Sequence, residues 1–201
     1  MATRIGYIIL IMLSSILFTA CPKECISTTH SFVCKVRYTP SDSLIKVGDT
    51  LWINSSFSCK GLLNTVTQKQ EDYCGSIINS TLGAVTLKGD LNPAIDSFDF
   101  VSRKGQIVTD PAINPNKIKQ LYFANNNDQY ELMIGVIAKK RGRYYFSVSE
   151  GIASRKNVGC EKAAFNISIE NSIKNLQMVT NFIGRDISEY ERIHGYCFEV
   201  K

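Results

Sequence analysis

The stretch Phe32-Val-Cys-Lys-Val-Arg-Tyr-Thr39 repeats its apolar residues with a period of two. In a strand, one face would carry the side chains of Phe32, Cys34, Val36 and Tyr38. The opposite face would carry Lys35, Arg37 and Thr39. One apolar and one polar face at this period are typical of a strand that is buried on one side. This stretch predicts a mainly-β protein.

The same pattern recurs along most of the chain. After turns at Pro40–Asp42 and at Gly48-Asp49, apolar residues alternate from Leu51 to Cys59. Further short strands, rich in β-branched or aromatic residues, are expected at 84–88, 95–101, 118–124, 130–138, 143–149, 163–169 and 196–200. Asn125-Asn-Asn-Asp128 predicts a hairpin turn, because Asn and Asp tolerate positive φ. Many short strands without long helices between them predict a single β-sandwich domain over residues 32–201.

Two segments resemble parts of immunoglobulin-like sandwiches. Lys46-Val-Gly-Asp-Thr-Leu-Trp-Ile53 resembles the entry to their second strand. Arg141-Gly-Arg-Tyr-Tyr-Phe-Ser-Val148 resembles a late strand in which a Tyr after a Gly makes a corner contact. The resemblance implies an immunoglobulin-like antiparallel β-sandwich. It bears on the fold and not on an activity, because such sandwiches carry many functions.

A small helical insertion is expected near the C-terminus, at about residues 172–194. Apolar side chains recur at helical spacing before a stop at Gly184, namely Ile173, Leu176, Val179 or Thr180, and Ile183. A second short helix would be capped by Asp186, with Glu189 at the capping-box position and one apolar side formed by Ile187, Tyr190 and Ile193. We expect these helices to cover the strand at 131–138, because both of its faces are apolar.

The first twenty residues have the layout of a secretory signal peptide. A single basic residue, Arg4, precedes an apolar run from Tyr7 to Phe18, which is shorter than the roughly 20 residues of a spanning helix. Leu17-Phe-Thr-Ala-Cys21 resembles the lipobox of bacterial lipoproteins, in the looser Bacteroidetes-type form with Phe18 in place of Leu. The resemblance implies a lipid on the Cys21 thiol and a tether over residues 21–31. Lys23-Glu24 would suit a surface-export signal or a solvated tether, so the periplasmic and surface faces of the outer membrane both stay open.

The cysteine count fits this anchor. The chain has 7 Cys, and acylation of Cys21 would leave an even number for disulfides in an oxidising compartment. The disulfide candidates are Cys25, Cys34, Cys59, Cys74, Cys160 and Cys197. Spacing favours the pairs Cys59–Cys74 and Cys160–Cys197, which leaves Cys25 with Cys34, although the sequence alone does not fix the connectivity. No pair has Cys-x-x-Cys spacing, so no metal site is expected.

Few residues suggest a ligand or a reaction. Trp52, the sole Trp, alternates with polar residues, so an outward indole beside amides and hydroxyls would make a candidate ligand platform. Lys139-Lys-Arg-Gly-Arg143 is the only dense basic cluster; it would suit a phosphate or a lipid head group, and a solvated hairpin also accounts for it. Asp96 and Asp99 would point to opposite faces of a strand, which is a poor arrangement for catalysis. No catalytic residue and no cofactor is expected.

These features predict a lipid-anchored protein of the bacterial cell envelope that presents a binding or structural β-sandwich to a glycan or a protein. The charged fraction of 20% and the hydrophobic fraction of 44% exclude a disordered, collagen-like or coiled-coil chain, and the net charge of +5 implies no particular partner. Nucleic acid is not expected as a ligand. Two alternatives stay open: an envelope enzyme such as a glycan hydrolase, and a secreted eukaryotic glycoprotein with sugar on Asn54, Asn79 or Asn166.

Overall fold

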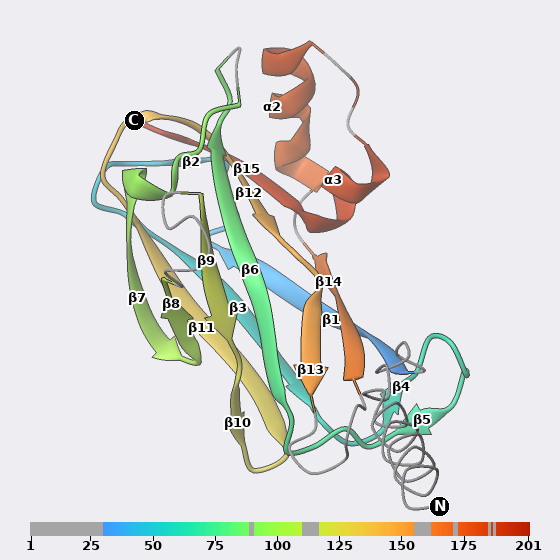
Figure 1. Cartoon of the computed structure of the whole chain (residues 1–201). Helices are drawn as coiled ribbons and strands as arrows, with labels where there is room; N and C mark the ends of the chain where they lie inside the picture. The colour runs from blue at the N-terminus through green and yellow to red at the C-terminus, as the bar shows by residue number, and fades with distance from the viewer. Residues whose placement is uncertain are drawn as a thin grey trace, which may run out of the picture.

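The protein is a β-sandwich of two sheets, shown by a computed structural model that describes residues 30–88, 91–109, 117–154, 162–170, 173–184, 186 and 188–201 (Figure 1). Sheet B contains β3 (Thr50–Ser58), β7 (Phe98–Lys104), β10 (Ala124–Asn126) and β11 (Gln129–Ala138). Sheet A contains β2 (Leu44–Ile45), β6 (Ile77–Thr86), β8 (Gln106–Val108), β9 (Ile118–Tyr122), β12 (Gly142–Val148), β13 (Gly151–Ser154), β14 (Lys162–Ile169) and β15 (Gly195–Val200). The expected mainly-β, immunoglobulin-like sandwich is confirmed.

Strand β1 (His30–Thr39) belongs to both sheets. Its residues from His30 to Val36 pair in parallel with β14, and its last residues pair antiparallel with β3. Where β1 leaves β3, the Ser55 hydroxyl donates a hydrogen bond to the Lys35 carbonyl at 2.7 Å. The Glu170 amide donates to the Val36 carbonyl at 2.9 Å. Backbone groups that lose their ladder partner at this crossing are thereby satisfied.

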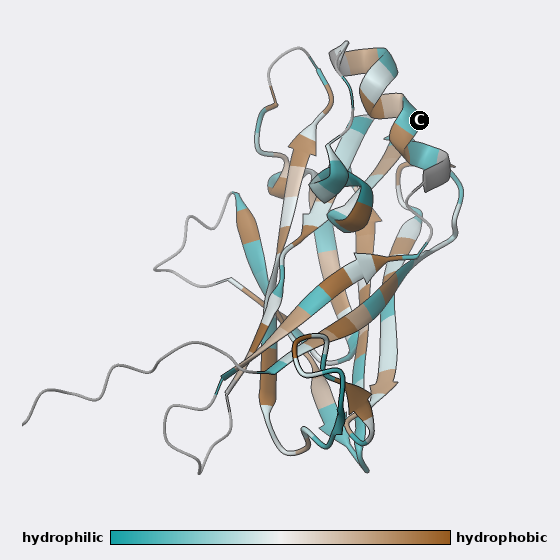
Figure 2. Cartoon of the chain, turned by 90° about the vertical axis from the view of Figure 1, so that its right-hand side faces the viewer, coloured by the Kyte–Doolittle hydropathy of each residue, from teal (hydrophilic) through white to brown (hydrophobic). Residues whose placement is uncertain are grey.

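The alternation read from the sequence is the alternation of burial in the structure. The side chains that β1 directs into the core are Phe32, Cys34, Val36 and Tyr38. Figure 2 shows hydrophilic and hydrophobic residues alternating along several strands, as one-sided burial requires. The predicted hairpin turn joins β10 to β11, and Asn127 and Asp128 have φ values of 47° and 64°. The Tyr144 hydroxyl donates to the Lys140 carbonyl at 3.0 Å, which is the corner contact that the resemblance implied.

The structure differs from the predicted strands in several places. Strand β6 begins at Ile77 and not at Ala84, because its polar first half gains ladder partners on both sides from β13 and β9. Residues Ile95–Ser97 form a 3-10 helix (η1) ahead of β7 where a strand was expected. A small hairpin of β4 (Leu62–Leu63) and β5 (Gln70–Glu71) was not anticipated. His30 and Ser31, expected in the tether, already belong to β1.

Helices α2 (Ile173–Ile183) and α3 (Glu189–His194) lie where the insertion was predicted, but they cover a different strand. They pack against β15, β14 and β12 of sheet A (Figure 1). Leu176 and Val179 of α2 form a second small core with Leu87 and Cys197. The expectation that the helices cover β11 is wrong. Because β15 begins at the residue after α3 ends, the helices are held to the strand that they enter.

The second helix is capped two residues later than the sequence suggested. Ser188 is the N-cap: its hydroxyl accepts a hydrogen bond from the Glu191 amide at 3.2 Å, and the Glu191 carboxylate accepts one from the Ser188 amide at 2.9 Å. This completes a capping box whose N-cap lies two residues downstream of Asp186. Tyr190 and Ile193 are 53% and 39% exposed, so the expected apolar side of α3 is not buried. The Gly184 stop is confirmed, with a φ of 70°.

Within the described ranges, neither helix has the length and hydropathy needed to cross a membrane. The predicted signal peptide at 1–20 and the anchor residue Cys21 lie outside the described residues.

Candidate functional site

Trp52 lies on the outer face of sheet B, as predicted from its position in the polar set of the alternation, with Asn54 and Ser56. Its neighbours Leu51 and Ile53 are fully buried in the core, whereas Trp52 is half-buried on the opposite side of β3. The strand register places Thr39, Trp52, Gly135 and Val101 in one row across four strands. A Cβ atom on Gly135 would come within 3.0 Å of Cζ3 of Trp52. The indole therefore packs over Gly135, where the side chain of any other residue would collide with it.

Arg103 covers the indole from the solvent side of the sheet. Its guanidinium carbon lies 4.2 Å from the centroid of the Trp52 ring. This is cation–π geometry, and Arg on Trp is the most favourable form of that contact. The Trp52 ring is therefore already occupied by a cation, and a sugar would have to displace Arg103 in order to stack there.

Apolar side chains surround Trp52. Met133 and Ile137, from the outward side of β11, are half-buried, and Val101 of β7 is 40% exposed. These are the residues whose period had suggested a helical cover over β11. In the strand register Met133 lies between Asn54 and Lys104, and Ile137 lies between Thr50 and Asp99. No helix in the described part of the chain covers them, so the apolar centre of the sheet B face stays partly open to solvent.

Charged residues form the rim of this centre. Arg37 Nε and Lys35 Nζ lie 3.4 Å and 3.7 Å from the carboxylate of Glu170. Lys104 forms an ion pair with Glu131 across the β7–β11 pair. We refer to Trp52, Val101, Arg103, Met133 and Ile137, with this charged rim, as the sheet B face.

A groove of about 440 Å³ opens within the sheet B face where β1 diverges from β3. Its wall from β1 carries Lys35 and Arg37, and its wall from β11 carries Glu131 and Met133. Asn54 lies between them on β3, where its amide donates to Thr39 Oγ1 at 3.3 Å. The groove thus forms at the point where β1 passes from one sheet to the other and separates from β3.

The two aspartates considered for catalysis meet in a different place from the one expected. Because residues 95–97 form a 3-10 helix, Asp96 and Asp99 line one groove of about 360 Å³ and do not point to opposite sides of a strand. Asp96 forms an ion pair with Lys140 at 3.3 Å, and Asp99 forms one with Lys139 at 2.8 Å. Each carboxylate is thus held by its own lysine.

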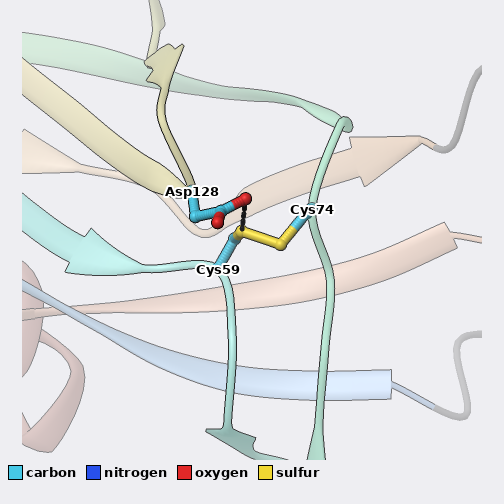
Figure 3. A group of neighbouring side chains, drawn as sticks. All are labelled: Cys59, Cys74 and Asp128. Carbon is cyan, nitrogen blue, oxygen red and sulfur yellow. Dashed lines mark hydrogen bonds between the residues drawn. A yellow bond between two sulfur atoms is a disulfide. The ribbon is translucent and has the colours of Figure 1, made fainter.

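The predicted Cys59–Cys74 disulfide is formed (Figure 3). Cys59 follows β3 of sheet B and Cys74 precedes β6 of sheet A, so the bridge links the two sheets at one end of the sandwich. Asp128 lies beside it, with Oδ1 4.0 Å from Cys59 Sγ, and forms an ion pair with Lys60 that raises the Lys60 pKa. Both sulfur atoms are committed to the bridge, so these three residues do not form a metal-binding set.

The other two predicted bridges are wrong, because Cys34 and Cys197 are buried free thiols. Cys34 points into the sandwich core 3.4 Å from Ser55 Oγ, and Cys197 lies in the small core beneath α2. Burial raises the pKa of each thiol to about 12. Their expected partners, Cys25 and Cys160, lie outside the described residues.

Sequence reasoning found Trp52 but missed Arg103, Gly135 and Glu170. The pairing that brings Arg103 and Gly135 to Trp52, and Glu170 to Arg37, joins strands from distant parts of the chain, and no local pattern encodes it. A glycine within the apolar run at 131–138 was the one available signal, because glycine in a strand often marks a close approach of another group.

These features define a class: a mainly-β, immunoglobulin-like sandwich whose outer sheet B face has an aromatic centre and a charged rim.

No family model and no curated protein matches the chain. Solved structures do match. The human F-spondin reeler domain has 13% identity and a TM-score of 0.33, covering 71% of this chain and 96% of its own. The second type II cohesin module of the adaptor ScaA scaffoldin of Acetivibrio cellulolyticus has 10% identity and a TM-score of 0.31, covering 64% and 87%. These likenesses assign no partner and no activity to this chain.

Proposed function

We propose that this chain is a protein-binding β-sandwich of the bacterial cell envelope, anchored by a lipid on Cys21, and that its partner docks on the sheet B face. The observation that carries the proposal is the composition of this face. Trp52, Met133 and Arg103 are the residue types that are enriched in the buried centre of protein interfaces. Trp and Arg also dominate the few positions that supply most of the binding energy.

The charged rim supports a protein partner further. The rim carries both signs of charge, in Lys35, Arg37, Lys104, Glu131 and Glu170. Mixed charges around an apolar centre fix the orientation of a partner and disfavour wrong ones. A glycan is the alternative ligand. It is less well supported because the indole face on which a sugar would stack is covered by Arg103.

The lipid anchor is supported by the sequence around Cys21, where a lipobox-like stretch ends the apolar run of the signal peptide. A lipoprotein cysteine carries more than one acyl chain, and stable membrane attachment requires more than one. Mass spectrometry of the mature N-terminal peptide tests this part: we expect a peptide that begins at Cys21 and carries the lipid mass. A Cys21→Ser variant should be processed differently and leave the membrane fraction. A mature chain with an unmodified Cys21 thiol would overturn the anchor.

Site-specific crosslinking tests the docking face. A photoreactive residue in place of Met133, in cells that produce the protein, should give a discrete protein adduct. The matched control carries the same residue at Ile152, which is 54% exposed on the outer face of sheet A. Trp52→Ala and Arg103→Glu should each abolish the adduct formed from position 133. Equal adducts from positions 133 and 152, or no adduct from 133, would contradict the proposal.

The glycan alternative has its own readout, because Trp52 is the only Trp of the chain. Any ligand that displaces Arg103 from the indole must change the emission of Trp52. Titration with soluble envelope oligosaccharides should leave that emission unchanged if the partner is a protein. A saturable shift with oligosaccharide would replace the protein by a glycan as the ligand of this face.

The secreted-glycoprotein alternative conflicts with this docking face. Asn54 lies on β3 between Trp52 and the groove, and its side chain donates hydrogen bonds to Thr39 and to the Trp52 carbonyl. A sugar on Asn54 would cover the sheet B face. The mass of the Asn54 peptide should therefore equal its unmodified value.

A further inference from the structure

The basic cluster at Lys139–Arg143 forms an exposed turn, and its residues from Lys140 to Arg143 also line a pocket. The cluster connects β11 to β12 at the end of the sandwich where the C-terminus also lies (Figure 1). The pocket has a volume of about 390 Å³, and its polar walls carry Lys88, Lys140, Arg141, Arg143 and Glu199. It is separate from the sheet B face, because it shares no residue with that face and its remaining walls come from η1 and from β6 and β12 of sheet A with the residue after β6.

The charges of this pocket are unbalanced, in contrast to those of the sheet B face. Four cationic side chains line it with a single acidic one, Glu199. Glu199 lies 3.7 Å from Arg143 Nε, and Lys140 is engaged by Asp96 at 3.3 Å. Within the described part of the chain, Arg141 makes no ion pair. The lining therefore carries a net positive charge, which attracts an anion.

The backbone of the turn is held in place by contacts that do not use the charged groups. Tyr144 Oη donates to the carbonyls of Lys140 and Arg141, at 3.0 Å and 3.4 Å. The Lys139 amide donates to the Ser97 carbonyl at 3.0 Å. The Arg143 guanidinium lies 3.7 Å above the ring of Phe182 of α2, which fixes its plane. The backbone of the turn and the Arg143 guanidinium are therefore held in place before a ligand binds, which reduces the ordering cost of binding.

We propose that this pocket binds the phosphate group of a ligand. Guanidinium groups match the oxygen geometry of phosphate, and a phosphate carries more charge than a carboxylate to offset several cations at once. This site goes beyond the proposed protein docking on the sheet B face and does not depend on it.

The phosphate could belong to a lipid head group or to a soluble molecule, and the position of the pocket favours the soluble source. His30, the first described residue, lies at the end of the sandwich that carries β4 and β5, whereas the basic turn lies at the opposite end (Figure 1). A chain held at its N-terminal end would therefore present the pocket away from its own bilayer.

Calorimetric titration of the mature chain with sodium tripolyphosphate tests the proposal, with sodium sulfate at equal ionic strength as the comparison. We expect saturable binding of tripolyphosphate that is weakened by about tenfold in Lys140→Ala/Arg141→Ala, the change expected when charge-assisted hydrogen bonds are lost. The matched control is Lys69→Ala, an exposed lysine in the β4–β5 hairpin at the other end of the molecule. It should change the dissociation constant by less than about twofold, because distant exposed charges are screened by salt.

Vesicles of phosphatidylcholine with and without phosphatidylglycerol separate the two sources. Binding of tripolyphosphate without binding of the anionic vesicles would identify a soluble phosphate ligand. Binding of the anionic vesicles that is lost in Lys140→Ala/Arg141→Ala would identify a lipid head group as the source of the phosphate.

The proposal would be overturned by any of three results: no binding of tripolyphosphate, equal binding of sulfate, or equal weakening by Lys69→Ala. Circular dichroism confirms that each variant is folded.

Discussion

The outer faces of the two sheets are built by the same alternation of residues, yet they differ in what covers them. On sheet A, α2 lies over β15, so that Tyr196, Cys197 and Phe198 are all buried on both sides of the strand. On sheet B, the outward residues Met133 and Ile137 are only half-buried. The comparison shows that an apolar outward face has two outcomes: a helix of the same chain covers it, or it stays open for a partner.

Even the uncovered half of the sheet A face differs from the sheet B face. Its strand register places Ala164, Ile152, Asn79, Tyr122 and Gln106 in one row. That row contains no cation–π pair, whereas the Trp52 row of sheet B is covered by the guanidinium of Arg103. This difference is the reason why docking is assigned to sheet B, and the predictions below test it.

Removal of the Cys59–Cys74 disulfide should have the largest effect, because this bridge ties the two sheets together. The cysteines are 15 residues apart, and a loop of that length corresponds to about 3 kcal/mol in the chain-entropy model. Cys59→Ala/Cys74→Ala should lower the free energy of unfolding by about that amount in a urea titration. An unchanged urea midpoint would show that packing alone holds the sheets together at this end.

Weakening the packing of α2 against sheet A should have the next largest effect on stability. Leu176→Ala removes a side chain that is 3% exposed in the small core beneath α2, and it should cost about 2–3 kcal/mol. It should also speed the alkylation of Cys197 relative to Cys34, because opening of the helices exposes only the former. Peptide mass spectrometry after timed alkylation measures both rates.

The exposed Gln177→Ala of the same helix is the control, and it should alter neither rate. Equal acceleration at Cys34 and Cys197 would mean that the helical cover and the sandwich open together as one unit.

A substitution on sheet B with a smaller expected effect on stability tests how the Trp52 side chain is packed. Gly135→Ala places a Cβ atom 2.7 Å from Val101 Cγ2 and 3.0 Å from Trp52 Cζ3, so the indole must move. We expect a loss of about 1–2 kcal/mol and a shift of Trp52 emission. Ser56→Ala, an exposed position on the same face, should leave both unchanged. Identical emission of the Gly135→Ala variant and the parent protein would contradict the stacked arrangement.

The smallest effect concerns pH and the docking of α3. Burial lowers the pKa of His194, so the folded protein holds this imidazole neutral. The unfolded chain takes up the proton first as the pH falls below the ordinary His value of about 6.5, and stability is lost from there downward. His194→Gln should therefore reduce the loss of melting temperature between pH 7 and pH 5.5. An NMR titration in which His194 protonates at or above the ordinary value would contradict this assignment.

The sequence predicted what depends on neighbours along the chain. The period of two gave the inward side chains of β1 and β3, and Asn125–Asp128 gave the hairpin turn. Prediction from the sequence failed where a residue's contacts are with residues far away along the chain. Nothing local indicated that β1 pairs with β14, that η1 brings Asp96 and Asp99 to one groove, or that Cys34 is a free thiol in the core. The helical cover was predicted as an element but assigned to the wrong strand, because an apolar face alone does not identify what packs on it.

The parallel pairing of β1 with β14 has a mechanical consequence. The chain enters the sandwich at His30, and the next residues through Val36 are all paired with β14 in one register. A force applied to the N-terminal end of β1 along the strand direction is shared by all of these hydrogen bonds. They must therefore break together and not one after another. A domain tethered by this end would therefore resist extraction by force more strongly than its equilibrium stability suggests.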